Sequence, residues 1–438
     1  MNPFFAEALD LREHPIKKAK KTIQAEYYAA LTYLLEKTGV NHCEWMAELE
    51  EYISERMRQY RTQLFLDSIP TKNEDYCSSC FSLCVTKPWR TKYRFMLVCD
   101  AALMLLDKRL VYQAASIVKQ LVSHRKQSEI DGLLASLFDG CPVEKRYLSV
   151  ESLIEQYRRN YTFLLQPTKK IIVTANMSAG KSTLINALIG KPVARTSQEV
   201  CTGNVYCLFN KAFEDGNVHL ATSSINLMAT FEDLHKYNWD EHIAMASYFS
   251  GVAVQFPRLC IIDTPGVDAA LHQEHSHRTH DALTSETYDM VLYVVSPTRL
   301  GTDAEKRHLK WVAQHLPKDK LIFVLNKLDD YRAVSDSVDE SMRGLQKDLL
   351  EMGFENPIIC PISAYFSYLL KLKLTEQPLS EDEADEYALY AKKFMRDAYD
   401  LSQYYDGVQC SPDDSQEVLL SKHAGLFGLE KMICGGKT

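Results

Sequence analysis

The fold is decided by residues 175–183, which read Ala175-Asn176-Met177-Ser178-Ala179-Gly180-Lys181-Ser182-Thr183. An apolar run, Ile171 to Thr174, precedes this stretch, and a helical apolar pattern follows it from Leu184. A loop between a strand and a helix can turn backbone N–H groups toward phosphate oxygens, and the helix N-terminus adds partial positive charge. The stretch therefore predicts a phosphate-binding P-loop, with Ala175 in place of the usual first glycine.

Two further motifs stand at the ends of apolar runs. Asp263-Thr264-Pro265-Gly266 follows Leu259 to Ile262, and Asn326-Lys327-Leu328-Asp329 follows Leu321 to Leu325. The Asp329 carboxylate can accept two hydrogen bonds from the ring N–H and the amino group of guanine, which adenine does not present in that arrangement. Since charged hydrogen bonds contribute about 1.5 to 3 kcal/mol each, the motif predicts binding of GTP in preference to ATP.

These motifs supply the candidate site. We expect Lys181 to bridge the terminal phosphates, Ser182 to give its hydroxyl to Mg²⁺, and Asp263 to hold a magnesium-bound water. The Gly266 N–H is expected to meet the γ-phosphate, and a backbone N–H of Ser363-Ala364 to read the guanine carbonyl. The residues expected to contact GTP or GDP are Asn176, Met177, Ala179, Gly180, Ser182, Thr183, Asn326, Lys327, Asp329, Ser363 and Ala364.

Short apolar runs alternate with helical patterns after Lys170, which predicts an α/β domain with a mostly parallel sheet flanked by helices. The expected strands are Ile171 to Thr174, Val205 to Phe209, Val252 to Phe256, Leu259 to Ile262, Val291 to Val295, Leu321 to Leu325 and Ile358 to Ile362. The preceding residues show helical periodicity over 23–35, 45–60, 93–107, 109–124 and 150–165, which predicts an all-α N-terminal region.

We therefore expect a helical domain over 1–145, a connecting neck helix over 146–168, a GTPase domain over 169–370 and a C-terminal helical segment over 371–438. Ser380 and Glu383 predict a capped helix start in the last segment. The apolar stripes of the helix 150–165 and of the tail around Leu426 and Leu429 each need a partner. We expect the two to pack together as a neck.

Charge and composition limit the partners and the compartment. The chain has 50 basic and 58 acidic residues, a formal charge of −8, which argues against nucleic acid as a partner. The same charge argues against an anionic membrane as a partner of the whole surface and leaves a local basic patch open. The chain's first residues lack a signal-peptide pattern, and its 12 cysteines suit a reducing compartment. We expect a cytoplasmic protein, peripheral at a membrane if it meets one.

The motifs as a set resemble those of the dynamin family of large GTPases, in particular bacterial dynamin-like proteins, over roughly Lys169 to Ala364. The P-loop segment Ser178 to Ser182 matches, and Cys201-Thr202 matches the threonine of the family's switch I. The resemblance implies that Ser178 helps to hold a monovalent cation, Na⁺ or K⁺, and that Thr202 binds Mg²⁺ and positions the attacking water. With Lys181 and Gly266 they form the expected catalytic set.

The resemblance also implies GTPase-domain dimerisation across the nucleotides and a role in membrane remodelling. Met177 stands where classical dynamins have glutamine, and the sequence stops soon after Leu429, so we expect either a shortened chain or a protein without a full membrane-binding stalk. These two departures favour the alternative of a slow GTPase switch or scaffold that recruits a protein partner through its helical regions.

Three other clusters carry weaker hypotheses. Cys77, Cys80 and Cys84 are interpreted as buried or loop thiols in preference to a metal site. The histidines His272, His275, His277 and His280 are interpreted as polar residues of a switch II segment, Val267 to His280. The lysines Lys17, Lys18, Lys20 and Lys21 are interpreted as a solvated helix face in preference to a membrane contact.

Overall fold

The computed structural model describes residues 6–435 except 39–46, 67–68, 70–72, 195–204, 231–232, 235–242, 267–278, 285 and 333–335. The chain divides into two compact units. Unit 1 comprises Met1–Pro167 and Lys211–Ala229, and unit 2 comprises Thr168–Asn210 and Thr230–Thr438. Within the described ranges, no helix is both long enough and apolar enough to span a bilayer.

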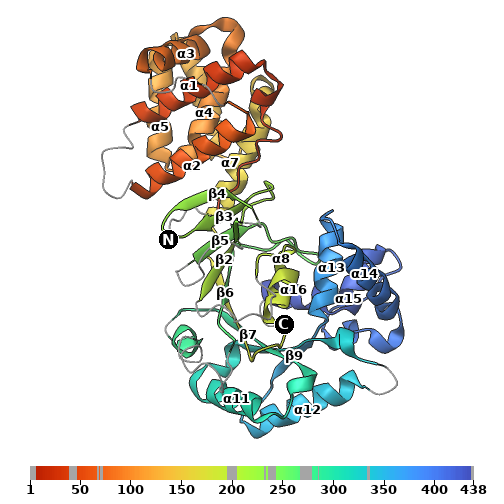
Figure 1. Cartoon of the computed structure of the whole chain (residues 1–438). Helices are drawn as coiled ribbons and strands as arrows, with labels where there is room; N and C mark the ends of the chain where they lie inside the picture. The colour runs from red at the N-terminus through yellow and green to blue at the C-terminus, as the bar shows by residue number, and fades with distance from the viewer. Residues whose placement is uncertain are drawn as a thin grey trace. The chain divides into compact units, whose positions relative to one another are not determined.

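Unit 1 is built from helices packed around α4, as Figure 1 shows. Every side chain of α4 from Tyr93 to Leu105 is buried, because the helix contacts α1, α3, α5 and α7 on different sides. Helices α3 and α6 were not expected from the sequence. The helices are α1 Lys21–Lys37, α2 Ala47–Gln63, α3 Glu74–Thr86, α4 Thr91–Leu105, α5 Lys108–Gln120, α6 His124–Phe138 and α7 Glu151–Leu164.

An antiparallel hairpin from the middle of the chain also belongs to unit 1. Its strands are β3, Val218–Ala221, and β4, Ile225–Ala229, and β4 contacts α2. Leu227 is fully buried in the core of the helices, and the N–H of Ile225 donates to Glu51 at 2.8 Å. Unit 1 is therefore discontinuous in sequence, because residues 211–229 complete a fold that begins at the N-terminus.

Buried charges fasten this inserted segment to the N-terminal residues. The Lys211 ammonium lies 2.5 Å from the Asp215 carboxylate, and both side chains are fully buried. The backbone N–H of Leu9 donates to the second oxygen of Asp215 at 3.0 Å. Burial alone would raise the pKa of Asp215, but Lys211 and His219 lower it to about 2, so the pair stays charged.

Unit 2 contains the sheet that the sequence predicts, in the order β5-β2-β6-β1-β7-β8-β9. Strands β6, β1, β7, β8 and β9 run parallel, whereas β2 is antiparallel to β6. Ile172 pairs with Ile262 on one side and with Val291 on the other. The α/β prediction is confirmed. The strands are β1 Lys169–Ala175, β2 Tyr206–Asn210, β5 Ile243–Ser247, β6 Leu259–Asp263, β7 Met290–Val295, β8 Leu321–Leu325 and β9 Ile358–Pro361.

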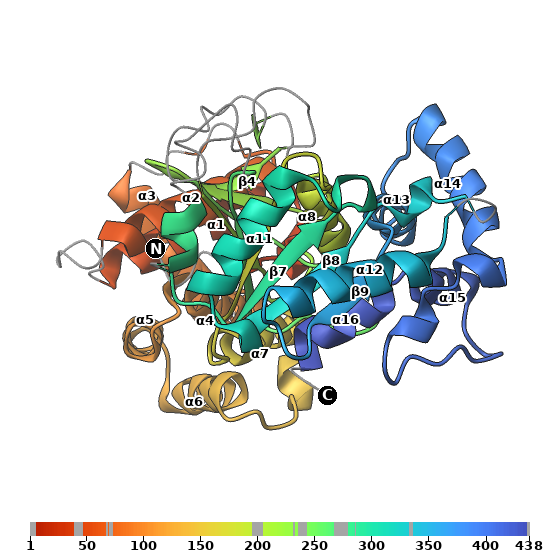
Figure 2. The ribbon, with the colours of Figure 1, turned by 90° about the horizontal axis from the view of Figure 1, so that it is seen from below.

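Helices cover both faces of this sheet (Figures 1 and 2). Leu309 of α11 and Leu345 of α12 share a core with Tyr293 and Phe323 of the strands, while α8 packs with α13 and α16. Ser380 and Glu383 form the expected capping box of α14. The helices are α8 Lys181–Ile189, α11 Asp303–His315, α12 Val338–Glu351, α13 Ala364–Leu374, α14 Glu381–Phe394, α15 Gln416–His423 and α16 Leu426–Gly435.

The expected strand over Val252 to Phe256 is wrong, because these residues form a bend. The backbone N–H groups of Val252 and Ala253 donate to one carboxylate oxygen of Glu430, at 2.7 and 2.8 Å, and not to a neighbouring strand. A Cβ at Gly251 would lie 1.9 Å from the Val254 carbonyl oxygen, so the bend requires glycine. On the side of β2 that does not pair with β6, the neighbouring strand is β5, whose alanines and serine give little β signal.

The expected pairing of the helix 150–165 with the C-terminal tail is also wrong. The apolar residues Leu153 and Ile154 of α7 are buried in the core of unit 1, where α7 packs on α4 and α6. Leu426 and Leu429 of α16 are fully buried in unit 2, where α16 packs on α15 and α8. Each apolar face is satisfied within its own unit.

The substitution Glu430→Leu should destabilise unit 2. Glu430 lies 2.6 Å from the Lys371 ammonium, with the two side chains 0% and 1% exposed, so its loss leaves a buried charge unpaired. We expect a loss of about 3 to 5 kcal/mol in urea denaturation, the range typical of a broken buried pair. Adding Lys371→Met should recover part of that loss. The exposed Glu351→Gln is the control, with a change below about 0.5 kcal/mol.

Candidate nucleotide-binding site

Four of the predicted motifs meet at one edge of the sheet in unit 2. The P-loop follows β1, Asp263 ends β6, Asn326 follows β8 and Ser363 closely follows β9. These strands are parallel, so their carboxyl ends lie at the same edge. Open α/β sheets bind ligands at this edge, outside the carboxyl ends of the strands.

The P-loop needs glycine at position 180. Gly180 has φ of 88° and is the N-cap of α8, where it offers no side chain to cap the first N–H groups. A Cβ on Gly180 would lie 2.3 Å from the amide nitrogen of Asn326. Ala175, which replaces the usual first glycine, is fully buried in β1 opposite Val294, so its methyl group is accommodated in the sheet. Ser178 also has a positive φ, 62°.

Lys181, the first residue of α8, forms an ion pair with Asp263. Their side chains are only 13% and 10% exposed. Beside them, the Thr264 hydroxyl donates to the Val173 carbonyl at 3.0 Å, which ties the segment after β6 to β1. The predicted phosphate-binding lysine and magnesium-binding carboxylate thus share one location.

Gly266 lies against Met177. A Cβ on Gly266 would be 3.4 Å from Cγ of Met177, an ordinary van der Waals contact. The thioether of Met177 has no hydrogen to donate and is only a weak acceptor. The side chain therefore adds an apolar surface beside Gly266.

Asn326 joins the P-loop to the loop after β9, which is expected to read the base. Its amide nitrogen donates to the Ala179 carbonyl at 3.0 Å, and its amide oxygen accepts from the Ala364 N–H at 3.0 Å. Lys327 follows with φ of 65°, and its side chain lies beside Gly180. The amide is buried, and both its nitrogen and its oxygen form hydrogen bonds that hold the loops together.

Asp329 is held by the residue after the last strand. The Ser363 hydroxyl donates to Asp329 Oδ1 at 2.7 Å. The Lys393 ammonium donates to the carbonyls of Asp329 and Tyr331. Burial raises the pKa of Asp329, and the hydrogen bond from Ser363 opposes that rise. Asp329 and Ser363, both predicted to read guanine, are therefore in direct contact.

The side chain of Asn176 is hydrogen-bonded to α11. Its amide nitrogen donates to Glu305 Oε2 at 2.6 Å, and the Tyr293 hydroxyl donates to Glu305 Oε1 at 2.8 Å. The side chain of Asn176 thus anchors the P-loop to α11. Ser182 and Thr183 lie half-buried in the first turn of α8.

Four of the candidate residues, Thr202, His272, His275 and His277, lie outside the described residues. His280 stacks on Trp311, with ring centroids 3.6 Å apart. Burial lowers the pKa of the neighbouring His308 to about 3, so that ring is neutral. The thiols of Cys77, Cys80 and Cys84 are buried along α3, as interpreted from the sequence.

Three supporting residues were not found by sequence reasoning. Glu305 holds Asn176, Lys393 holds the loop after Asn326, and the Ala424 carbonyl accepts from the Ser363 N–H at 3.0 Å. Glu305 carried a weak signal, because it is an acidic residue on the buried face of an amphipathic helix. Lys393 and Ala424 carried none, since their roles depend on how the C-terminal helices return to the sheet.

The P-loop, the aspartate at the end of β6 and the Asn326 to Asp329 loop define a P-loop GTPase. Residues 171–328 match the model of the Dynamin family. Over these residues the chain is similar to proteins of the dynamin family.

One curated relative is the protein described as "Probable transmembrane GTPase FZO-like, chloroplastic" from Arabidopsis thaliana. It is 24% identical over 206 residues, which cover 46% of this chain and 20% of the relative. The chain thus spans about a fifth of that relative's length.

Similar solved structures include other GTP-binding proteins. Era from Aquifex aeolicus, bound to GDP·AlF4⁻, is 18% identical and covers 49% of this chain and 59% of its own, with a TM-score of 0.28. Toc33 from Arabidopsis thaliana, with Mg²⁺ and GMPPNP, is 16% identical, covers 45% and 71%, and has a TM-score of 0.30.

Binding of GTP should weaken in acid through Asp329. Only the ionised carboxylate accepts both guanine hydrogen bonds, and its raised pKa means that protonation begins above the ordinary value of about 3.9. Affinity for a fluorescent GTP analogue should therefore fall as the pH is lowered toward this raised pKa, at a higher pH than an aspartate of ordinary pKa would give.

The matched control is Asp329→Asn, which should bind GTP about a hundredfold more weakly at pH 7. The only change in its affinity with pH should be the change caused by protonation of the nucleotide's phosphates. Equal pH profiles for the wild type and Asp329→Asn would exclude the carboxylate as the titrating group.

Proposed function

We propose that the strand edge of unit 2 binds GTP in one orientation, with its phosphates on the P-loop and its guanine against Asp329. The observation that carries the proposal is the pair of hydrogen bonds made by Asn326, which sets the P-loop and Ala364 on either side of one side chain. Guanine would be read by the Asp329 carboxylate and a backbone N–H at Ser363-Ala364. Backbone N–H groups from Asn176 to Thr183 would hold the phosphates.

The donor set beside Lys181 fits Mg²⁺. The Ser182 hydroxyl and the Asp263 carboxylate are hard oxygen ligands, and Mg²⁺ is usually held by a few such groups together with phosphates and waters. We expect the Thr202 hydroxyl, from outside the described residues, to join them. When bound, the ion would neutralise charge on the β- and γ-phosphates. In the described structure Asp263 forms an ion pair with Lys181. Bound GTP would attract the Lys181 ammonium to its phosphates, which would leave the Asp263 carboxylate available to Mg²⁺.

Hydrolysis would rely on positioning and electrostatics. Thr202 would orient the attacking water, the Gly266 N–H would bind a γ-phosphate oxygen, and Lys181 would stabilise charge in the transition state. Ser178 would help to hold Na⁺ or K⁺ near the developing charge, as the dynamin resemblance implies.

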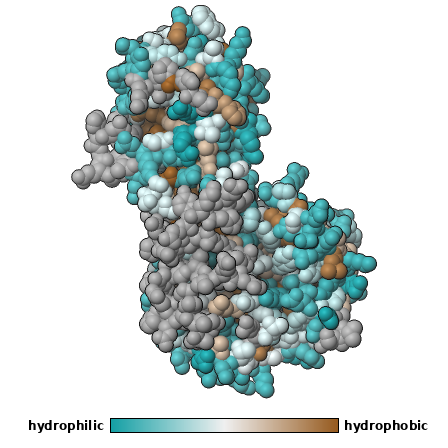
Figure 3. Space-filling model, viewed as in Figure 1, coloured by the Kyte–Doolittle hydropathy of each residue, from teal (hydrophilic) through white to brown (hydrophobic). Residues whose placement is uncertain are grey.

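We propose further that the protein works as a dynamin-like GTPase, cytoplasmic and peripheral at a membrane, through GTPase-domain dimers. The family match over 171–328 supports this, and the Arabidopsis relative is itself described as a transmembrane GTPase. Figure 3 shows apolar residues among hydrophilic ones on the surface of unit 1. Phe65 and Trp89 are 77% and 76% exposed, and each lies near a lysine, Lys21 and Lys87 respectively. Exposed aromatics beside lysines suit an anionic bilayer surface.

The contact between Met177 and Gly266 favours a second function, a slow GTPase switch or scaffold. A glutamine at position 177 could hydrogen-bond a water, and the thioether cannot do so effectively. Slow turnover would leave the GTP state long-lived, which suits recruitment of a protein partner through unit 1.

Two substitutions should separate binding from turnover. Lys181→Ala should abolish GTP binding, because it removes the charge that meets the phosphates. Thr202→Ala should keep affinity within a few-fold and lose most of the turnover, since its contacts would form chiefly in the transition state. Phosphate release and nucleotide titration measure the two properties. Met177→Gln is the gain-of-function variant, and unchanged turnover in Thr202→Ala would reject the role of Thr202.

Turnover against protein concentration decides between the two functions. A dimerising GTPase should show turnover per molecule that rises with concentration and with added anionic liposomes, and a dimer in light scattering with GDP and aluminium fluoride but not with GDP alone. A monomer under every nucleotide condition, with constant turnover per molecule, would leave the switch as the function.

A further inference from the structure

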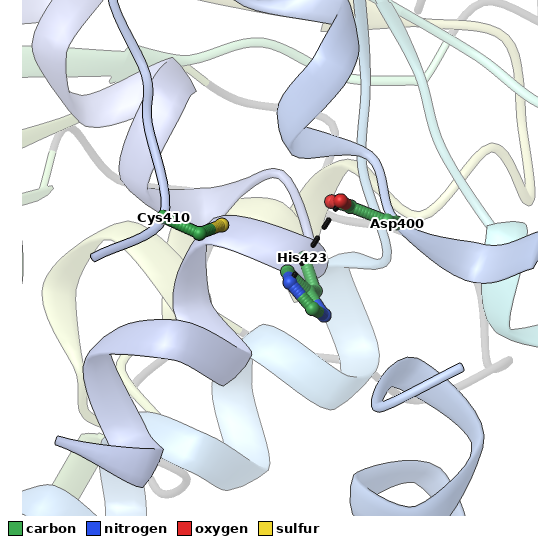
Figure 4. Close-up of side chains that lie close together, drawn as sticks. All are labelled: Asp400, Cys410 and His423. Carbon is green, nitrogen blue, oxygen red and sulfur yellow. Dashed lines mark ion pairs between the residues drawn. The ribbon is translucent and has the colours of Figure 1, made fainter. Parts of the chain in front are cut away.

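Three metal-binding side chains converge in the C-terminal part of unit 2, as Figure 4 shows. An oxygen of Asp400, the sulfur of Cys410 and a ring nitrogen of His423 all lie within 4.8 Å of one another. Asp400 follows a short 3-10 turn, Cys410 lies in the loop before α15, and His423 is the last residue of α15. Separate segments of chain thus bring a carboxylate, a thiol and an imidazole together.

The imidazole is oriented as a metal-binding histidine. Nδ1 of His423 lies 2.6 Å from the Phe394 carbonyl oxygen, so Nδ1 carries the proton and donates it. In the neutral ring the lone pair is then on Nε2, which lies 3.8 Å from Asp400 Oδ2. A backbone acceptor on the other ring nitrogen is the usual support of a metal-ligating histidine.

Nε2 and the carboxylate of Asp400 therefore face each other, and a positive charge, from a proton on Nε2 or from a bound cation, would make this arrangement favourable. The other oxygen of Asp400 accepts from the Ser402 N–H at 2.8 Å, which orients the carboxylate. The Leu401 N–H donates to the His423 carbonyl at 3.0 Å, which joins the two segments. The carboxyl end of α15 adds partial negative charge beside the cluster.

The nearest lysine does not supply that positive charge. Lys422, adjacent to His423, forms an ion pair with Asp414 at 2.5 Å and donates to the Gln409 carbonyl at 2.7 Å. Its ammonium is thus committed to the loop that contains Cys410. The Cys410 thiol itself lies 3.7 Å from the Ser402 hydroxyl, a weak contact that a metal bond would replace.

We propose that Asp400, Cys410 and His423 bind a zinc ion. One thiolate, one imidazole and one carboxylate suit Zn²⁺, whereas Mg²⁺ and Ca²⁺ prefer oxygen ligands alone. Ligands about 2.0 to 2.3 Å from a tetrahedral ion lie roughly 3.4 Å from one another. The present separations reach that value with inward shifts of about 1 Å or less, and water takes the fourth position.

The ion would brace the loops that read guanine, a consequence that rests on the proposed function. Ala424, next to His423, accepts from the Ser363 N–H. Phe394, which accepts from His423, follows Lys393, whose ammonium holds the Asp329 loop. A zinc ion at His423 would therefore restrain both contacts at once.

The test is titration of the metal-free full chain with Zn²⁺ and with Co²⁺. One equivalent of Co²⁺ should give the intense d–d bands of tetrahedral coordination and a sulfur-to-cobalt charge-transfer band. Cys410→Ser should abolish the charge-transfer band, and Asp400→Asn and His423→Gln should weaken binding about tenfold or more. Zn²⁺ should raise the melting temperature of the wild type and not of these variants.

Cys141→Ser is the matched control, because Cys141 is also an exposed free cysteine but lies in unit 1. It should bind Zn²⁺ and Co²⁺ like the wild type. A charge-transfer band that survives Cys410→Ser, or no Co²⁺ band in the wild type, would overturn the proposal. Because Asp329→Asn should retain the metal and lose guanine selectivity, failure of the nucleotide proposal would be distinct from failure of this one.

Discussion

The amide of Asn326 is the interaction on which the site depends. It is buried at the edge where the parallel strands end, and it donates to the P-loop and accepts from the loop after β9. Leaving either partner of a buried hydrogen bond unsatisfied costs about 1 to 3 kcal/mol, so the amide fixes the distance between the two loops. The same side chain excludes any Cβ at Gly180, so the P-loop and the base-reading loop constrain each other's sequence.

The segment 211–229 of unit 1 lies, in sequence, between two of the motifs predicted to form the nucleotide site. The chain leaves unit 2 after β2, contributes residues 211–229 to unit 1 and returns before β5. Thr202 lies shortly before β2, and Asp263 lies at the end of β6, so the excursion falls between two of the motifs expected to meet Mg²⁺. Since Lys211 and Asp215 are buried with the N-terminal residues, the excursion is anchored in unit 1. The chain therefore passes between the two units at three points of the sequence, after Pro167, after Asn210 and after Ala229.

The sequence predicted the parts of the fold that local patterns encode. Strands β1, β6, β7, β8 and β9 were expected within about one or two residues of their observed ends, because an apolar run followed by a motif fixes both type and position. The bend after Gly251 could not be predicted, since its N–H groups are satisfied by Glu430 from the far end of the chain. The cluster of Asp400, Cys410 and His423 was missed for a similar reason, because no metal-binding spacing in the sequence connects the three residues.

The C-terminal helices are part of the nucleotide-binding domain and not an appendage to it. Gly425 has φ of 83°, and a Cβ there would lie 2.2 Å from the Pro361 carbonyl oxygen, so the turn between α15 and α16 packs directly against the end of β9. Ala424 holds the backbone of Ser363, and Ser363 in turn holds Asp329. The hydrogen bond that holds Asp329 therefore depends on residues nearly a hundred positions further along the chain. A change in the packing of α15 would reach Asp329 through two consecutive hydrogen bonds, with no alteration of the P-loop.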